Sequence, residues 1–279
     1  MAASLLTFHV PPDASPDQVL LLVERLSEEP TARFSSNREL LEFADAWNID
    51  SRSEIPALAT ALGLLDRDAN GVSISETGLM LQRLKPQVRP DVAHFMLYTG
   101  WSAERPATNV PFWSYRLVCD YFWEHSPLDI LQTATALVEE VINRSEHVFA
   151  GVYGYSPNAV SFSDKSIRGV RKWLEVLRPP VIEGDTFTRR HFCPPELLLL
   201  ALGYVARQTG AEIGIDLLLT PERREMLCRV CLLEPTALDR ALDWMLPLYP
   251  AIVELGTRTG TYGRFVLLCK IPELSDLKT

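Results

Sequence analysis

The segment that most constrains the fold of this chain runs from Ser161 to Cys193 and predicts a helix, a sharp stop and a tight hairpin. Ser163 can cap the start of the helix, because its hydroxyl can accept a hydrogen bond from an otherwise unpaired backbone N–H. Apolar residues then recur at three- and four-residue spacing, at Ile167, Val170, Trp173, Leu174 and Leu177. This spacing places them on one buried stripe of the helix.

The second half of the segment predicts the hairpin. Pro179 and Pro180 stop the helix, because proline lacks the backbone N–H that a further helical turn needs. Two short strands are expected at 181–182 and 186–188, on either side of a turn at 183–185.

Basic residues gather in this same segment. It carries seven Lys/Arg and four Asp/Glu, a net charge of +3, whereas the whole chain of 279 residues carries −9, so the rest carries −12. The overall acidity argues against a protein that coats nucleic acid indiscriminately. Lys165, Arg168, Arg171 and Lys172 fall largely off the apolar stripe, so we expect them to face water or a partner.

The composition is that of an ordinary globular chain, long enough for two or three compact units. It contains no uninterrupted apolar run of about 18 residues or more, so no membrane span or membrane partner is expected. The opening residues lack the basic start and long apolar core of a secretory signal. The five cysteines suggest no disulfide framework, and we therefore expect a cytoplasmic protein.

The pattern of helices followed by a hairpin occurs three times. In the first copy, helices are expected at 19–26, 37–47, 53–62 and 76–84, with a hairpin that turns at Asn70-Gly71. In the third copy, helices are expected at 196–208, 221–232 and 235–245, with a hairpin over 252–269. Apolar pairs four residues apart seat the third helix of each copy: Leu58/Leu62, Val170/Leu174 and Leu238/Leu242.

An aromatic-rich segment lies between the first and second copies, from Pro90 to about Tyr155, with helices expected at 91–99, 112–123 and 128–149. Its aromatic side chains predict a packed helical core, with a protein interface or stacking on exposed bases as alternatives. The chain is accordingly predicted to form three domains, at 1–89, 90–193 and 194–279.

Residues 17–87, 161–193 and 194–271 resemble the winged helix-turn-helix superfamily. Within the first of these, GLLDRDANGVSISETG is similar to the wing of many winged-helix regulators. The resemblance implies a mainly α protein with short β-hairpin wings, in which tandem winged-helix domains surround a central helical segment. A further resemblance rests on the opening LLTFHVPPDASPDQVLLLVERL, which is similar to accessory proteins of bacterial DNA-modification and antiviral defence clusters, such as the DpdG type.

In a winged helix, the third helix can enter the major groove of DNA. We therefore hypothesise that the second copy binds duplex DNA through Lys165, Arg168, Arg171 and Lys172 on the helix and through Arg189 and Arg190 on the wing. The alternative is a solvated face whose charges pair with acidic neighbours in the same chain. The third helices of the other copies are poorer in cations and suit protein contacts better.

No catalytic residue, cofactor or metal site is predicted. Cys228 and Cys231 could join His191 and Cys193 around zinc, but the pair lies in a predicted helix, where cysteines pack as small apolar residues. The chain shows no nucleophile elbow and no HExxH motif.

The glycines at 256, 260 and 263 resemble a phosphate-binding loop only superficially, because no Lys-Ser/Thr pair and no helix follow them. We expect them at a wing tip, where Arg258 and Arg264 are available to a nucleic-acid backbone.

Two functions remain open. In the first, the chain is a non-catalytic DNA-binding adaptor subunit of a multiprotein complex and grips duplex DNA through 161–193. In the second, it is a scaffold whose tandem winged helices contact proteins only, as the kleisin-binding subunits of SMC complexes do. The basic segment favours the first function, and the overall acidity favours the second. Both predict protein partners.

Overall fold

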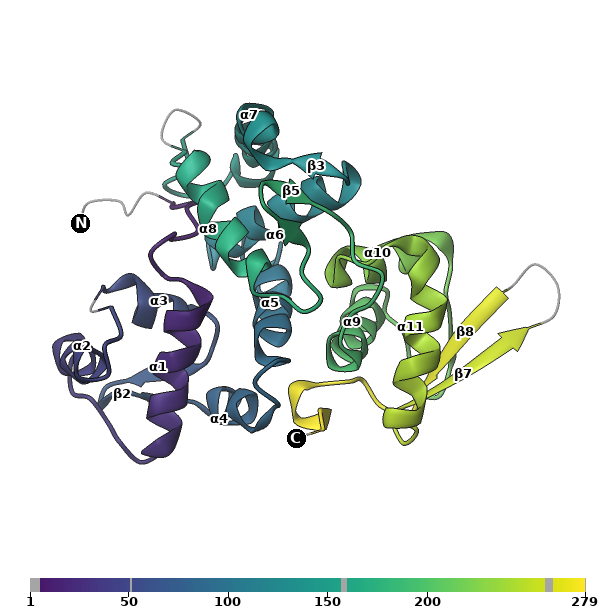
Figure 1. Ribbon diagram of the computed structural model, residues 1–279, viewed down its shortest axis with the longest axis horizontal. Helices are drawn as coiled ribbons and strands as arrows, with labels where there is room; N and C mark the ends of the chain where they lie inside the picture. The colour runs from purple at the N-terminus through teal and green to yellow at the C-terminus, as the bar shows by residue number, and fades with distance from the viewer. Residues whose placement is uncertain (1–5, 51, 157–159, 259–262, 279) are drawn as a thin grey trace. The chain divides into compact units, whose positions relative to one another are not determined.

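The computed structural model describes residues 6–50, 52–156, 160–258 and 263–278 (Figure 1). The chain forms two compact units, Met1–Thr188 and Arg189–Thr279. The described residues are mainly helical, with small antiparallel sheets, which confirms the predicted class of a mainly α protein with short hairpins. The division into three domains stays a prediction.

The first unit begins with a repeat of helices and one hairpin. Its elements are α1 (Pro16–Glu28), α2 (Asn37–Ala46), α3 (Glu54–Ala61), β1 (Leu65–Asp68), β2 (Gly71–Ile74) and α4 (Glu76–Arg83). The hydroxyl of Ser36 caps α2 by accepting from the backbone N–H of Glu39. Asp68 pairs with Gly71, so the hairpin turns at 69–70, one residue earlier than predicted. An extended residue before α2, Phe34, bridges to Val72 of β2.

The second repeat follows directly in the same unit. Its elements are α5 (Arg89–Thr99), α6 (Val110–Glu124), β3 (Leu128–Asp129), α7 (Ile130–Phe149), α8 (Asp164–Glu175), β4 (Ile182–Glu183) and β5 (Thr186–Phe187). Strand β3 was not predicted, because Leu128 and Asp129 were assigned to the following helix. Asp129 instead caps α7, accepting from the backbone N–H groups of Leu131 and Gln132 at 3.0 Å. The strands lie in the order β3-β5-β4.

The core of the second repeat confirms that most of the aromatic-rich segment packs inward. Phe95, Tyr98, Phe112, Trp113, Tyr115, Phe122 and Trp123 are all buried. The segment supplies α6 and α7, which pack against each other and against α8.

A stretch of extended chain at residues 6–15, which we call the strap, packs against the second repeat although it precedes the first (Figure 1). The indole N–H of Trp173 donates to the carbonyl of Ala14 at 3.2 Å, and the hydroxyl of Ser114 donates to the carbonyl of Phe8 at 2.6 Å. Gly169 makes this approach possible, because a Cβ there would lie 2.2 Å from the carbonyl oxygen of Val10. The strap was not anticipated from the sequence.

The second unit contains the third repeat. Its main elements are α9 (Pro195–Gln208), β6 (Asp216–Leu218), α10 (Pro221–Cys231), α11 (Leu238–Met245), β7 (Val253–Arg258) and β8 (Gly263–Leu268). Short 3-10 turns lie at η2 (Pro235–Ala237), η3 (Leu246–Leu248) and η4 (Leu274–Asp276). The strand order is β6-β8-β7, and β6 was not predicted. Residues 259–262, which include the predicted wing-tip Gly260, lie outside the described residues.

The three repeats share one order of elements: a helix, an extended segment, two helices and a hairpin. In each repeat, the extended segment pairs with the second strand of the hairpin: Phe34 with β2, β3 with β5, and β6 with β8. The third helices are therefore α3, α8 and α11, and these carry the surfaces that the sequence singled out.

Candidate nucleic-acid or protein interface

Helix α8 has the buried stripe that its sequence predicts. Ile167, Val170, Trp173 and Leu174 are buried, as is Leu177 just beyond the helix. Ser163 is the N-cap residue, and its backbone N–H donates to the hydroxyl of Ser166 at 3.3 Å. The helix ends at Glu175, before Pro179 and Pro180. The prediction for this segment is thus confirmed at the level of its elements and its core.

Three of the four cations of α8, Arg168, Arg171 and Lys172, have partners within the chain. Arg168 lies 3.6 Å from the carboxylate of Asp164, four residues before it. The ammonium of Lys172 donates to the carbonyl of Pro12 in the strap at 2.6 Å. Both side chains are exposed, but their charge is already shared with oxygen atoms of the same protein.

Arg171 is held most tightly of the predicted DNA-binding residues. Its guanidinium lies 2.6 Å from the carboxylates of Glu175 and Asp185 and donates to the carbonyl of Gly184 at 2.8 Å. The hydrogen bonds to Glu175 and Asp185 raise the pKa of Arg171 above its ordinary value. The side chain is only 23% exposed. These bonds connect α8 to the hairpin turn.

The hairpin turn between β4 and β5 is acidic. Glu183, Gly184 and Asp185 are exposed, and Gly184 has a φ of 58°, a conformation that favours glycine. A turn with two carboxylates repels phosphate unless cations outweigh them.

The placement of Arg189 and Arg190 on this wing was wrong. Strand β5 ends at Phe187, and both arginines belong to the second unit. Arg189 lies 3.4 Å from Glu234, while Arg190 is only 3% exposed and donates to the carbonyl of Cys231 at 2.8 Å. A side chain buried in this way reaches a phosphate only if the surrounding structure moves.

This placement changes the charge of the candidate surface. Without Arg189 and Arg190, the segment from 161 to 188 has five Lys/Arg and four Asp/Glu, a net charge of +1. The net charge of +3 calculated for residues 161–193 is therefore larger than the charge that α8 and its hairpin present to a partner. Such a small excess attracts the DNA backbone weakly.

Lys165 lines a pocket of about 570 Å³ between the strap, α3 and the start of α6. His9 and Asp13 of the strap line the same pocket, and His9 Nδ1 lies 2.7 Å from the hydroxyl of Ser166. Burial and the charge of Lys165 lower the pKa of His9 below its ordinary 6.5. Lys165 therefore acts on the ring of His9 at this pocket.

The third helices of the other two repeats differ from α8. Helix α3 contains no Lys or Arg. On α11, Asp239 pairs with Arg224 at 2.8 Å and with Arg264 at 3.1 Å, which draws Arg264 toward the carboxylate rather than leaving it for a nucleic-acid backbone. Hydrogen bonds from these two arginines lower the pKa of Asp239.

Trp244 is the large apolar residue that α11 exposes. Its side chain is 62% exposed, and its ring meets that of Phe192 edge-on at 5.6 Å. Exposed tryptophan is typical of protein contact surfaces, where it buries a large area when a partner binds. Sequence reasoning missed this residue, although the apolar spacing of 238–245 leaves position 244 off the buried stripe.

The three cysteines considered as zinc ligands pack as apolar residues. Cys193, Cys228 and Cys231 are buried, and burial raises the pKa of Cys228 to about 12. Among the described residues, no three His, Cys, Asp or Glu side chains gather where they could hold a metal ion. In the same part of the chain, no helix has the length and apolarity that crossing a membrane requires.

Comparisons with protein-family models, with curated proteins and with solved structures found no match. The function is therefore argued from the residues themselves.

Proposed function

We propose that this protein is a tandem winged-helix protein with three modules, built on α3, α8 and α11. The repeated order of elements supports this assignment, together with the pairing of each extended segment with the second hairpin strand. A third helix that packs beside a hairpin in this order is the arrangement expected of a winged helix.

We further propose that it acts as a non-catalytic adaptor that binds other proteins. The observation that carries this proposal is the pairing of the arginines on α8. Arg168 and Arg171 both bind carboxylates of their own chain, and the surface around them has a net charge of only +1. A helix in this state offers little to a duplex, whose affinity for proteins comes largely from phosphate contacts.

The exposed ring of Trp244 supports the same function from another module. A tryptophan on a third helix, beside Phe192 and close to Leu248 along the chain, gives a partner an apolar anchor.

Duplex DNA is the second candidate partner, because Lys165, Arg168 and Lys172 are exposed on one helix. A titration of the whole protein with labelled duplex separates the two functions. The adaptor predicts no binding at about 0.15 M salt, for the wild type and for the double variant Arg168→Ala/Lys172→Ala alike. Binding that the double variant weakens, with the slope of log K against log salt reduced by about 0.9 for each lost contact, establishes the DNA function instead.

The adaptor is tested directly by placing a photo-crosslinking residue at position 244. We expect one discrete protein to be crosslinked in cells that express the chain. The control is the same residue at position 153, because Tyr153 is also an exposed aromatic residue, at 85%. Equal crosslinking at 153 and 244 contradicts a contact surface centred on Trp244.

A further inference from the structure

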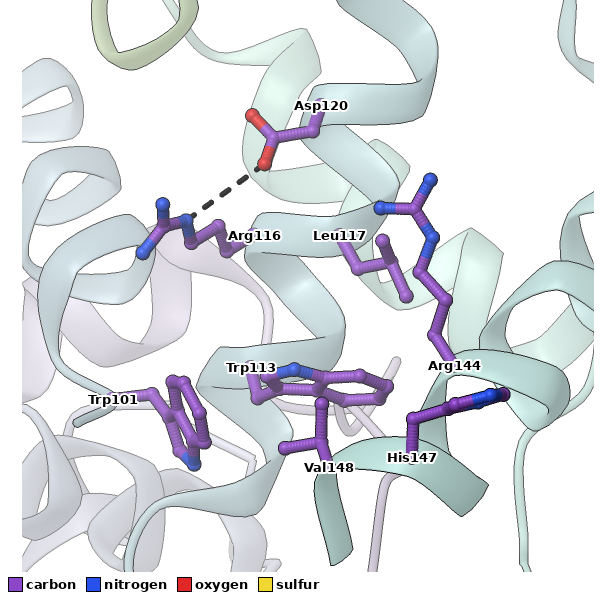
Figure 2. Close-up of a pocket in the computed structure, with 8 residues that line it drawn as sticks. All are labelled: Trp101, Trp113, Arg116, Leu117, Asp120, Arg144, His147 and Val148. Atoms are coloured by element: carbon purple, nitrogen blue, oxygen red, sulfur yellow. Dashed lines mark ion pairs between the residues drawn. The ribbon is translucent and has the colours of Figure 1, made fainter. Parts of the chain in front are cut away.

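A pocket of about 430 Å³ lies in the second repeat, between α6, α7 and the loop that follows α5 (Figure 2). It is separate from α8 and from its hairpin, and nothing in the proposed adaptor function uses it. Its volume falls in the range of small-molecule sites in proteins.

Two tryptophans border the pocket and are held in place. The indole N–H of Trp101 donates to the carbonyl of Pro106 at 3.1 Å. Trp113 is 7% exposed, and its ring meets those of Phe149 and Phe8 edge-on at 5.0 Å and 5.7 Å. Rings fixed in this way form rigid aromatic walls. Such walls favour stacking with a flat ring system such as a nucleobase, whichever base it is.

Two guanidinium groups stand over the same pocket, as Figure 2 shows. Arg116 Nε lies 3.7 Å from the carboxylate of Asp120, which also accepts from the hydroxyl of Tyr98 at 2.5 Å. Arg144 Nε pairs with Glu140 at 2.5 Å. Within the described part of the chain, the structure gives the two terminal nitrogens of Arg144 no partner. These nitrogens are donors for an incoming anion.

His147 adds an imidazole ring to the wall of the pocket. Its Nδ1 donates to the carbonyl of Asn143 at 3.0 Å, which leaves Nε2 for a ligand. Each arginine has one carboxylate beside it, Asp120 for Arg116 and Glu140 for Arg144, and each pair is formed through Nε. The terminal nitrogens of Arg144 remain as hydrogen-bond donors at the pocket.

From these walls and the terminal nitrogens of Arg144 we propose that the pocket binds a mononucleotide. The indoles suit a flat base, and the terminal nitrogens of Arg144, with Arg116 on the same wall, suit the phosphate joined to it. Neither stacking on the indoles nor binding of the phosphate distinguishes one base from another. The site is therefore expected to accept purine and pyrimidine mononucleotides.

The test is calorimetric titration of the full chain with AMP, adenosine and ribose 5-phosphate. We expect AMP to bind with a Kd below about 1 mM and each of the other two compounds to bind at least about tenfold more weakly. Arg144→Ala should weaken AMP binding about tenfold and leave adenosine unchanged, because it removes a phosphate donor only. Trp101→Ala should weaken both AMP and adenosine.

The matched control is Arg38→Ala. Arg38 lies on α2 and forms the same kind of pair four residues apart, with Glu42 at 2.8 Å, so this variant should bind AMP as the wild type does. If adenosine binds as tightly as AMP, the arginines do not bind the phosphate. If ribose 5-phosphate binds as tightly as AMP, the indoles do not bind the base. Failure of AMP, GMP, CMP and UMP to bind, or an Arg144→Ala variant with wild-type affinity, overturns the site. None of these outcomes depends on whether the chain binds a protein partner.

Discussion

The guanidinium of Arg171 lies 2.6 Å from the carboxylate of Asp185 and so joins helix α8 to the turn of its hairpin. The same group binds Glu175 and the carbonyl of Gly184. Arg171, which the sequence predicts as a DNA contact, thus connects a helix to the hairpin that follows it. Removing it should therefore affect stability, whether or not the chain meets nucleic acid.

Arg171→Ala is expected to lower the free energy of unfolding by about 1 kcal/mol, because it removes three charge-assisted hydrogen bonds, two of them to carboxylates, from a partly buried position. Urea titration followed by circular dichroism measures this loss. Arg168→Ala is the matched control on the same helix, since its single pair is longer, at 3.6 Å, and exposed, and it should change the stability by only a few tenths of a kcal/mol. Equal losses in the two variants contradict the tie between helix and hairpin.

Gly169→Ala should destabilise the first unit by about 1–3 kcal/mol, because the new methyl group would lie 2.2 Å from the carbonyl of Val10 and force the strap away from α8. The direction of the change in stability is informative, because alanine in the middle of a helix otherwise stabilises the fold by up to about 1 kcal/mol relative to glycine. Gly151→Ala is the control, because nothing lies within 4 Å of a Cβ there. A Gly169→Ala variant that gains stability shows that the strap does not lie on the helix.

His9 should make the strap sensitive to acid. Burial and the charge of Lys165 hold the pKa of His9 below 6.5, so the folded state binds fewer protons than the unfolded state near that pH. Its contribution to stability is complete above pH 6.5 and is lost as the pH falls below that value. The loss of stability between neutral pH and about pH 5.5 should be smaller in His9→Gln than in the wild type. An NMR titration of the ring tests the pKa directly, and a midpoint above 6.5 contradicts it.

Alkylation should distinguish one cysteine from the other four. Cys269 is exposed, whereas Cys119, Cys193, Cys228 and Cys231 are buried. Burial also raises the pKa of Cys119, Cys228 and Cys231, which keeps these groups as unreactive thiols. Iodoacetamide at about pH 8 should therefore modify Cys269 in the native protein and the others only in denaturant, as read by mass spectrometry of peptides. Rapid native labelling of Cys228 would contradict the packing of α10.

The helices could be predicted from the sequence because their signals are local. The apolar spacing of Ile167, Val170 and Leu174 lies within a single helix, and the structure buries all three. Strands β3 and β6 were missed because two or three residues are too few to show a period, and because neither is joined to its partner strand by a tight turn, as the equally short β4 and β5 are. Asp129 was the available signal for β3, since a residue that caps α7 marks the end of the segment before it.

The candidate surface was predicted less well, because it depends on partners far away in the chain. Arg189 and Arg190 follow the hairpin in sequence, yet they pack in the second unit. The hydrogen-bond acceptor for Lys172 is a backbone carbonyl of the strap. The spacing of residues along a helix cannot reveal a contact with such a distant part of the chain. Gly169 was the one local hint, because a glycine inside a helix usually needs a reason such as close backbone approach.

The strap also sets an order of events for a growing chain. His9 and Ser166 meet across 157 positions, with the whole first repeat and α5 to α7 between them. Before α8 has been synthesised, the strap can already meet α6, where the hydroxyl of Ser114 donates to the carbonyl of Phe8, but its contact with Trp173 is still missing. Closing the longer loop to α8 comes late and costs chain entropy. We therefore expect the strap to complete its packing only once the segment around Gly169 is available, so that the first and last helices of the first unit reach their final packing together.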